Sequence, residues 1–527
     1  MNLQIGRAGV PLRKSLPVLF FSVLAGAGFG LSYGWAGSNQ IVYVPPGLRI
    51  VDPTFLQADW WFNNTIHYHW AYTWLVAGLE RMGVLPWGLA LGNVVAIAVS
   101  LGFAWIWTTR YSRGWNAYLP WALFLFLFAA TDGFTSAAAS YLFRAELQAS
   151  SISTALTIGA FWWFVRGSEW KAGLSLGVAG IFHANFLPLN IGLFGVALAL
   201  SHLRKGRLSA RTLREMAGPG VRVLLPSLVI FLVSLPLFLE MALAEVPEAT
   251  AELASYIFYD FALPHHYNPR TFLIWFLPLA AWHALGLLWL GPAMNGTEDR
   301  HRWRGLLLGM FGMIWVAAFF TTVLFSETVS RLFVWRLAPF SVWVCALVFI
   351  VGVTNRWAAS VSSRGSLERG RVVGTGLAVL VLARFLAYRW GLVSLEASSQ
   401  LLVPLLLLTL SGLLVLRKSR PPEAASTPST KAATLAAVML STAALGLLAY
   451  NRSDEPEKLN LVALTEAERA EREAFDWIRS NTDPEAVFLI PPDLSNFRLF
   501  TGRGAVADLR TFPMTPVEIV EWYDRLQ

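Results

Sequence analysis

Apolar segments of about 17 to 25 residues recur along most of this chain, and they limit what it can fold into more than any other feature. A helix needs about 20 such residues to cross a bilayer, because in lipid every backbone polar group must be bonded within the helix itself. Only 14% of the residues are charged, against roughly 25% in soluble domains. The sequence therefore predicts a polytopic all-α membrane protein.

One of the apolar segments, 172–200, is too long for a single straight crossing. It contains "NFLPLN" at 185–190, where Pro188 removes a backbone donor and disfavours helix at the residue before it. We expect two short helices there that enter and leave the membrane on the same side. The predicted spans, about 13 with this hairpin, are 16–36, 86–108, 115–131, 147–165, the two halves of 172–200, 222–244, 272–290, 305–325, 334–354, 372–388, 401–416 and 432–450.

The basic residues give this topology a direction. With the hairpin, one set of loops holds roughly two dozen Lys and Arg, including "HLRKGRLSARTLREM" at 202–216 and "RHRWR" at 300–304, and the other set holds far fewer. Cytoplasmic loops carry such an excess, so we expect a cytoplasmic N-terminus and an exported C-terminus. The net charge of +8 then reflects loop composition and does not indicate nucleic acid. The one cysteine, Cys345, cannot form an intrachain disulfide.

The chain divides into two parts by composition. Residues 1–450 form the predicted transmembrane domain, with a long first outer loop at 37–85. Residues 451–527 combine a charged helix, strand-like "AVFLIPP" and "GAVADLR", and a helix opened by Thr515 and Pro516, which predicts a small extracytoplasmic α/β domain. The sequence stops at Gln527 directly after that helix, which leaves open whether the domain is complete.

Polar residues gather in the loops expected on the exported side. Charges near bilayer depth are costly and face a cavity or a partner, so these residues are candidates for a site. The candidate catalytic carboxylates are Asp59 and Asp52 of the first loop. The candidate substrate-binding residues are His265, His266 and Arg270 of "FALPHHYNPRTF", together with Arg331, Arg336, His183, Arg144 and Glu146.

Simpler roles compete with these assignments. A single interfacial Arg or His is more often a headgroup anchor than a ligand, and Asp52 before Pro53 is a natural turn residue. His67 and His69 are two residues apart and lack the i, i+4 spacing of a helical metal pair. Asp59 lies beside Trp60 and Trp61, an unusual place for a carboxylate with only a structural role.

The chemistry that suits this set is group transfer from an amphipathic carrier in the outer leaflet. A polyprenyl-phosphate sugar needs an apolar groove for its tail and cations for its phosphate, which guanidinium groups bind bidentately. It also needs a base for the proton of the acceptor. We expect Asp59 to be that base, with Asp52 as the alternative.

The architecture and several short blocks carry a resemblance. About 13 crossings, an acidic first outer loop and an exported C-terminal α/β domain resemble the GT-C superfamily of membrane glycosyltransferases. "AFDWIRSNTDPEAVFLIPP" at 474–492 is similar to the start of the soluble domain of oligosaccharyltransferase catalytic subunits. The tryptophan-aspartate-tyrosine-glycine signature of those subunits is replaced here by "IPPDLSNFRLF", which argues against a peptide sequon as acceptor. "FHANF" at 182–186, "PHHYNP" at 264–269 and "FRLFTGRGAVADLRTFP" at 497–513 resemble blocks of bacterial GT-C-like proteins.

The resemblance implies a GT-C-like fold and a glycosyltransferase of the bacterial cytoplasmic membrane. It would move a sugar from a polyprenyl-phosphate carrier to an acceptor glycan, lipid or protein at the outer face. No metal set is predicted, although a divalent cation such as Mg or Mn would suit a pyrophosphate donor. Two alternatives stay open, a non-catalytic GT-C-like subunit of a larger complex and a lipid-linked glycan polymerase or transporter.

Overall fold

The structure is a computed structural model of the whole chain. It describes residues 12–30, 35, 39–112, 117–134, 136–138, 140–202, 210–236, 239, 246–294, 299–360, 403–416, 430–453 and 466–527. The expected span at 372–388 lies outside these described residues.

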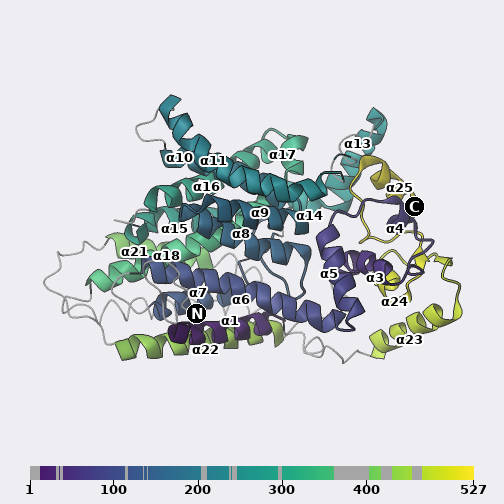
Figure 1. Cartoon of the computed structure of the whole chain (residues 1–527), viewed down its shortest axis with the longest axis horizontal. Coiled ribbons are helices and arrows are strands. Elements are labelled where there is room, and N and C mark those ends of the chain that lie inside the picture. Colours follow the sequence, from purple (N-terminus) through teal and green to yellow (C-terminus); the bar gives the residue numbers. More distant parts are fainter. Residues whose placement is uncertain are drawn as a thin grey trace.

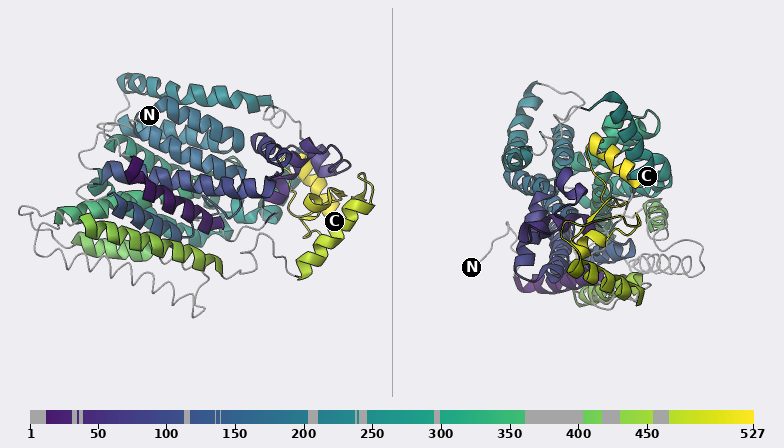
Figure 2. Two further views of the ribbon diagram at one scale, coloured as in Figure 1. Left: turned by 60° about the horizontal axis from the view of Figure 1, so that its bottom comes forward. Right: turned by 90° about the vertical axis from the view of Figure 1, so that its right-hand side faces the viewer.

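Long helices run side by side along the longest axis and make up most of the molecule (Figures 1 and 2). α10 packs antiparallel against α16, whereas α15 and α18 run parallel, since His283 lies beside Ser341 and Ala293 beside Asn355. The helices are α1 (Leu12–Phe29), α6 (Leu85–Tyr111), α7 (Tyr118–Ala130), α8 (Ala149–Val165), α9 (Glu169–Phe182), α10 (Phe186–His202), α11 (Ala210–Phe231), α15 (Phe276–Met294), α16 (Arg300–Thr322), α18 (Ala338–Ser360), α21 (Val403–Leu416) and α22 (Thr430–Ser453).

Within the described ranges, five helices are long and apolar enough to cross a membrane. They are Leu85–Tyr111, Arg214–Ser234, Leu273–Met294, Arg300–Thr322 and Glu327–Arg356. Five further apolar helices are shorter, among them Ala149–Val165 and Phe186–His202. The protein is thus mostly helical and has the character of a membrane protein.

Ionic contacts hold one end of the helical bundle together. Asp299, before α16, accepts hydrogen bonds from Tyr111 (2.8 Å) and Arg166 (2.7 Å). Arg302 pairs with Glu169 at 2.6 Å, at the start of α9. We call this the ionic end, and its members come from α6, the α8–α9 turn and α16. Because both acids are buried, removing their cations would leave uncompensated charge inside the protein.

The hairpin expected in 172–200 is present, but it breaks at a different place. α9 starts at the ionic end, and α10 returns there, where Ser201 donates to the His301 carbonyl (3.1 Å). The chain turns at 183–185 and not at Pro188. Pro188 is the third residue of α10, and the first turn of a helix tolerates proline because its N–H groups have no intrahelical partner. The interruption predicted at Pro188 was therefore wrong by a few residues.

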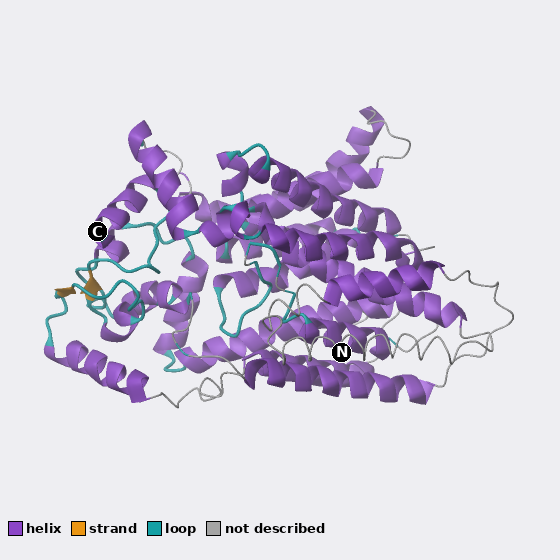
Figure 3. Ribbon diagram, turned by 180° about the vertical axis from the view of Figure 1, so that it is seen from behind, coloured by secondary structure: helices purple, strands orange, loops and turns teal. Residues whose placement is uncertain are grey.

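Short helices and loops crowd the opposite end, which we call the loop end (Figure 3). The first loop supplies α2 (Gln40–Tyr43), α3 (Pro45–Val51), α4 (Trp60–Asn64) and α5 (Trp70–Arg81). Later segments add α13 (Glu248–Tyr256), a π-helical turn at Ile257–Ala262 and α14 (Pro264–Tyr267). The 3-10 turns Leu232–Ser234, Pro269–Thr271 and Leu273–Trp275, helix α17 (Glu327–Arg331) and the 3-10 turn η6 (Val334–Leu337) complete it.

The C-terminal segment lies at the loop end, beside the first-loop helices (Figure 1). It contains α23 (Glu466–Asn481), β1 (Val487–Phe488), α24 (Phe497–Thr501), β2 (Gly504–Ala505) and α25 (Pro516–Leu526). The two strands fall within the two segments expected to be strands, and they pair in parallel. α25 starts with a capping box between Thr515 and Glu518, which satisfies two of the free N–H groups of a helix N-terminus.

Glycines let neighbouring helices approach closely. A Cβ on Gly305 of α16 would lie 2.2 Å from the Ala197 carbonyl oxygen of α10. A Cβ on Gly173 of α9 would lie 2.3 Å from the Val223 carbonyl oxygen of α11. Small residues at such contacts are the usual basis of helix packing in membranes.

Gly305→Ala should therefore destabilise the protein by about 1–3 kcal/mol, the range for overpacked sites. The control is Gly312→Ala on the same helix, where nothing lies within 4 Å of the added Cβ. There the better helix propensity of alanine should leave stability unchanged or slightly raised. Thermal unfolding in detergent measures both, and equal shifts for the two variants would contradict the packing argument.

Candidate functional site

Asp59 lies in a buried ion pair at the junction of the first loop and the C-terminal segment. As N-cap of α4, its Oδ1 accepts a hydrogen bond from the Phe62 N–H (2.9 Å). Its Oδ2 accepts from Arg498 Nε (2.6 Å) and from the Ala505 N–H (3.0 Å). The carboxylate is fully buried, so both of its oxygens are occupied by protein donors.

Arg498 joins Asp59 to a second carboxylate, that of Asp508. The guanidinium pairs with both acids and donates to the Ala505 carbonyl (2.7 Å). Burial raises the pKa of Asp508, while the charge of Arg498 and the N–H groups of Thr511 and Arg510 oppose that rise. We call this group the Asp59–Arg498–Asp508 cluster. Its contacts fit a structural connection between residues far apart in the chain.

Asp52 has a local structural contact. It is the C-cap of α3, and its Oδ1 accepts hydrogen bonds from the Thr54 N–H (2.9 Å) and hydroxyl (2.7 Å). These bonds from Thr54 lower the pKa of Asp52. A cavity lies between the first loop and residues 512–514, and neither Asp52 nor Asp59 lines it. A catalytic base needs a carboxylate oxygen that can reach the acceptor, and these hydrogen bonds do not favour that role for Asp52 or Asp59. The role stays a prediction.

A small cavity of about 50 Å³ lies between the first loop and the C-terminal segment. First-loop residues form most of its wall, several of them aromatic or histidine, and residues 512–514 close the other side. The lining consists of Val42, Tyr43, Pro46, Trp61, Thr65, Ile66, His67, Tyr68, His69, Thr73, Phe512, Pro513 and Met514.

His69, which lines this cavity, packs against His183 with ring centres 4.9 Å apart. Arg336 lies next to them, with its guanidinium 5.6 Å from the Phe186 ring centre and 4.9 Å from that of Phe333. Tyr43 packs edge-on against His69 at 4.5 Å. These residues come from α2, the start of α5, the α9–α10 turn and η6, and we call them the Arg336 cluster.

Three nitrogens of the Arg336 cluster are buried and have no hydrogen-bond partner among the residues that the structure describes. They are His69 Nε2, His183 Nδ1 and Arg336 Nε. A buried polar atom left unpaired costs about 1–3 kcal/mol. A fold that places three of them together fits a site whose ligand supplies the missing bonds.

The same cluster keeps its histidine and tyrosine side chains uncharged at neutral pH. Burial and, to a smaller extent, the positive charge of Arg336 lower the pKa of His69 to about 4. Burial raises the pKa of Tyr267 to about 12. Arg336 is then the cation of this group, surrounded by neutral rings.

His265 and His266 lie close to the cluster, with the His266 ring centre 5.5 Å from that of Phe333. Their rings are 4.2 Å apart, and His266 Nδ1 lies 2.9 Å from the Ala138 carbonyl oxygen. Burial lowers the pKa of His266 to about 4, with added effects of His265, Arg336 and Arg144. Burial and the charges of Arg510 and Arg144 also lower the pKa of His265, which is exposed. Several arginines thus converge around this histidine pair.

The other predicted residues have separate contacts. Arg331 pairs with Glu327 one turn earlier, and Glu146 accepts a hydrogen bond from Gln148 (2.8 Å). The Arg144 guanidinium lies 4.4 Å from the Tyr141 ring centre. Arg270 is exposed in a turn. The structure therefore brings His183, Arg336, His265, His266 and Arg144 into one region and separates Arg331, Glu146 and Arg270 from the unpaired nitrogens.

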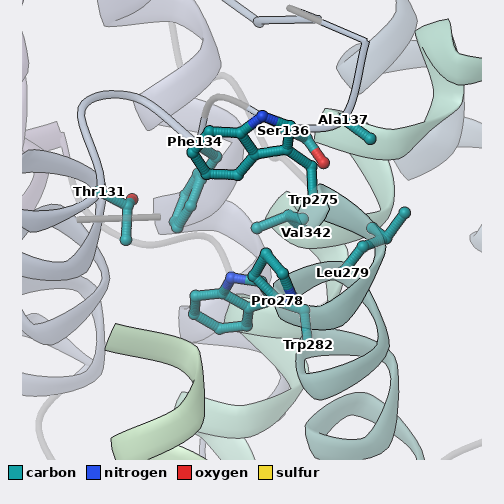
Figure 4. Close-up of a pocket in the computed structure, with 9 residues that line it drawn as sticks. All are labelled: Thr131, Phe134, Ser136, Ala137, Trp275, Pro278, Leu279, Trp282 and Val342. Carbon is teal, nitrogen blue, oxygen red and sulfur yellow. The ribbon is translucent and has the colours of Figure 1, made fainter. Parts of the chain in front are cut away.

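A second, narrow cavity of about 10 Å³ lies between the loop that follows α7 and the start of α15 (Figure 4). Phe134, Trp275 and Trp282 form much of its wall, with Thr131 and Ser136 as polar members. It is at the lower limit for a single water. The adjoining loop holds Asp132, Phe134 and Ala138 at positive φ, which is strained backbone for these residue types.

Metal binding finds no support in the described part of the chain, where no three His, Cys, Asp or Glu side chains come together. The divalent cation weighed for a pyrophosphate donor stays untested.

Several important residues were not predicted from the sequence. Tyr43, Tyr68 and His69 line the cavity. The sequence "HYHW" at 67–70 indicated a polar aromatic segment that includes the last two, and no signal indicated Tyr43. Arg498 and Asp508 lie in a block noted for family resemblance alone, and no local signal pairs Arg498 with Asp59, 439 residues away.

Comparisons with known proteins inform only the C-terminal segment. Residues 469–527 match the model of a domain of unknown function, DUF6798. No curated protein matches the chain. The matched segment includes α24, both strands and α25, and thus the Arg498 and Asp508 side of the buried cluster.

Breaking the buried cluster should loosen the junction between the first loop and the C-terminal segment. Arg498→Leu leaves two buried carboxylates without their cation, and removing one partner of a buried pair costs about 3–5 kcal/mol. We expect a clear drop in thermal stability and faster proteolysis of the C-terminal segment. Arg331→Leu is the control, because Arg331 forms an exposed ion pair with Glu327 within α17. Similar stability of the two variants would contradict a structural role of the cluster.

Proposed function

We propose that this protein binds a polyprenyl-phosphate-linked sugar at its loop end and transfers the sugar to an acceptor glycan, lipid or protein. The observation that carries the proposal is the Arg336 cluster, where the buried Nε of the Arg336 cation has no hydrogen-bond partner among the described residues. Phosphate oxygens are strong acceptors, and a charge-assisted bond from arginine is among the stronger protein contacts.

The charge balance around Arg336 supports an anionic ligand. Nearby acids have other partners, since Asp59 pairs with Arg498 and Glu327 pairs with Arg331. Within the described residues, Arg336 forms no ion pair with a carboxylate. A cation without a counter-charge in a low-dielectric setting attracts an anion more strongly than the same cation in water.

An apolar groove between α15 and α16 supports a lipid-linked ligand. Its wall includes Leu287, Phe311, Trp315 and Phe319. Ring contacts lead from it toward the cluster, from Trp315 to Phe276 (5.9 Å) and from Phe276 to Trp335 (5.3 Å), the residue before Arg336. A prenyl chain in this groove would keep its phosphate near Arg336.

A non-catalytic binding subunit is the second candidate. The observation that favours it is the lack of a free carboxylate at the cavity, since Asp59 and Asp52 both have structural contacts. Measured transfer from a labelled carrier by purified protein separates the two functions.

The proposal places the ionic end in the cytoplasm and the loop end outside, following the basic loops. We test this with single cysteines in a Cys345→Ser background, at Leu489, which is 87% exposed in the C-terminal segment, and at Arg300, which is exposed at the ionic end. In right-side-out vesicles, a membrane-impermeant maleimide should label Leu489→Cys directly and Arg300→Cys only after permeabilisation. Labelling of both without permeabilisation would contradict the topology.

Arg336→Gln should weaken binding of polyprenyl phosphate about tenfold or more, because a charged hydrogen bond contributes about 1.5–3 kcal/mol. Arg331→Gln is the matched control, since Arg331 already pairs with Glu327. Binding of a labelled polyprenyl phosphate to protein in nanodiscs measures both. Equal affinities for Arg336→Gln and the unmodified protein would refute the phosphate site.

A further inference from the structure

One nitrogen of the Arg336 cluster has its protonation fixed by the fold. His69 Nδ1 lies 3.0 Å from the Phe182 carbonyl oxygen. A carbonyl only accepts, so Nδ1 carries the hydrogen and the neutral ring has its lone pair on Nε2. That Nε2 is buried and has no hydrogen-bond partner. His69 therefore offers an acceptor, whereas phosphate recognition requires donors.

The position of this lone pair is also fixed. His69 is the N-cap of α5, and its carbonyl accepts the Thr73 N–H (2.9 Å). Its ring is held between Tyr43 (4.5 Å) and His183 (4.9 Å). The side chain lines the cavity that first-loop residues share with residues 512–514. The side chain that carries the lone pair is thus held at the wall of that cavity.

The charged and titratable groups around the ring keep it neutral. Tyr43 and Tyr68 face it from the first loop, His183 from the α9–α10 turn and Arg336 from η6, while His67 acts from nearby. Burial first and Arg336 and His67 after it lower the pKa of His69 to about 4. At pH 7 the ring is therefore uncharged, and its Nε2 carries a lone pair.

A histidine that only fills a core has both nitrogens bonded, and this protein contains one for comparison. His283 Nε2 lies 2.9 Å from Ser341 Oγ, and its Nδ1 accepts a hydrogen bond from Trp315 (3.0 Å). In His69, by contrast, Nδ1 is hydrogen-bonded to a backbone carbonyl, and the buried Nε2 has no partner among the described residues. This is the arrangement of a base that is oriented by a backbone carbonyl.

We propose that His69 is the general base of the sugar transfer, an assignment that rests on the proposed function. The acceptor hydroxyl oxygen forms a bond to the anomeric carbon of the sugar, and its proton moves to His69 Nε2. The bond between the anomeric carbon and the phosphate oxygen breaks, and its electron pair leaves with the polyprenyl phosphate. Arg336, beside His69, stabilises the negative charge of that leaving phosphate.

The experiment compares carrier binding and transfer in the same protein. His69→Gln should keep the affinity for labelled polyprenyl phosphate within about twofold and lower the rate of sugar transfer by about 10² to 10⁴, the range for a general base. His202→Gln is the control, since His202 also contacts a backbone carbonyl, that of Leu198 (2.9 Å), but belongs to the far end of α10. It should leave both quantities unchanged.

Two further measurements separate a base from a structural histidine. Added imidazole should restore part of the transfer rate of His69→Gly. In the unmodified protein, kcat/KM should stay level as pH falls below 6.5 and drop only nearer pH 4, because the free site must hold His69 neutral.

The outcomes are distinct. Transfer by His69→Gln within tenfold of the unmodified protein would overturn the assignment, and so would loss of carrier binding without rescue by imidazole. An unmodified protein that binds the carrier but transfers no sugar would overturn the base and leave a binding subunit. An unmodified protein that does neither would overturn the proposed function itself.

Discussion

The Asp59–Arg498–Asp508 cluster is the interaction on which the loop end depends. Its three charged side chains are fully or almost fully buried, so each is stable only while the others are in place. The cluster fixes α4 of the first loop to α24 and β2 of the C-terminal segment. Residues 512–514, which close the cavity, follow Asp508 within a few positions. The ion pair thus helps to position the segment that closes the cavity.

Arg336 has the opposite electrostatic setting. Arg498 is neutralised by two carboxylates, whereas Arg336 is surrounded by neutral imidazole, phenol and phenyl rings. One buried arginine is used for structure, and the other keeps its charge available. This contrast between two cations at the same end of the molecule is the main physical reason to place a ligand at Arg336.

The sequence predicted the helices well and the details of their packing less well. The length and apolar character of most spans follow from hydropathy, and the return of α10 to the ionic end follows from the basic loop after it. The break at 183–185 was misplaced, because the effect of Pro188 depends on its distance from the helix start. The close contact at Gly305 was also invisible, since it depends on which helix lies opposite.

The sequence by itself determined the mostly helical class of fold, the segregation of charge and the loops in which the candidate polar residues gather, because these depend on composition and on neighbours along the chain. It also indicated the region of His265, His266, His183 and Arg336. Only the tertiary structure decided which polar group has a partner. Asp59 is held by Arg498 from 439 positions away, and His69 is oriented by Phe182, 113 positions away. The role of a buried polar side chain is set by the atoms it meets across space, and residue spacing does not report those contacts.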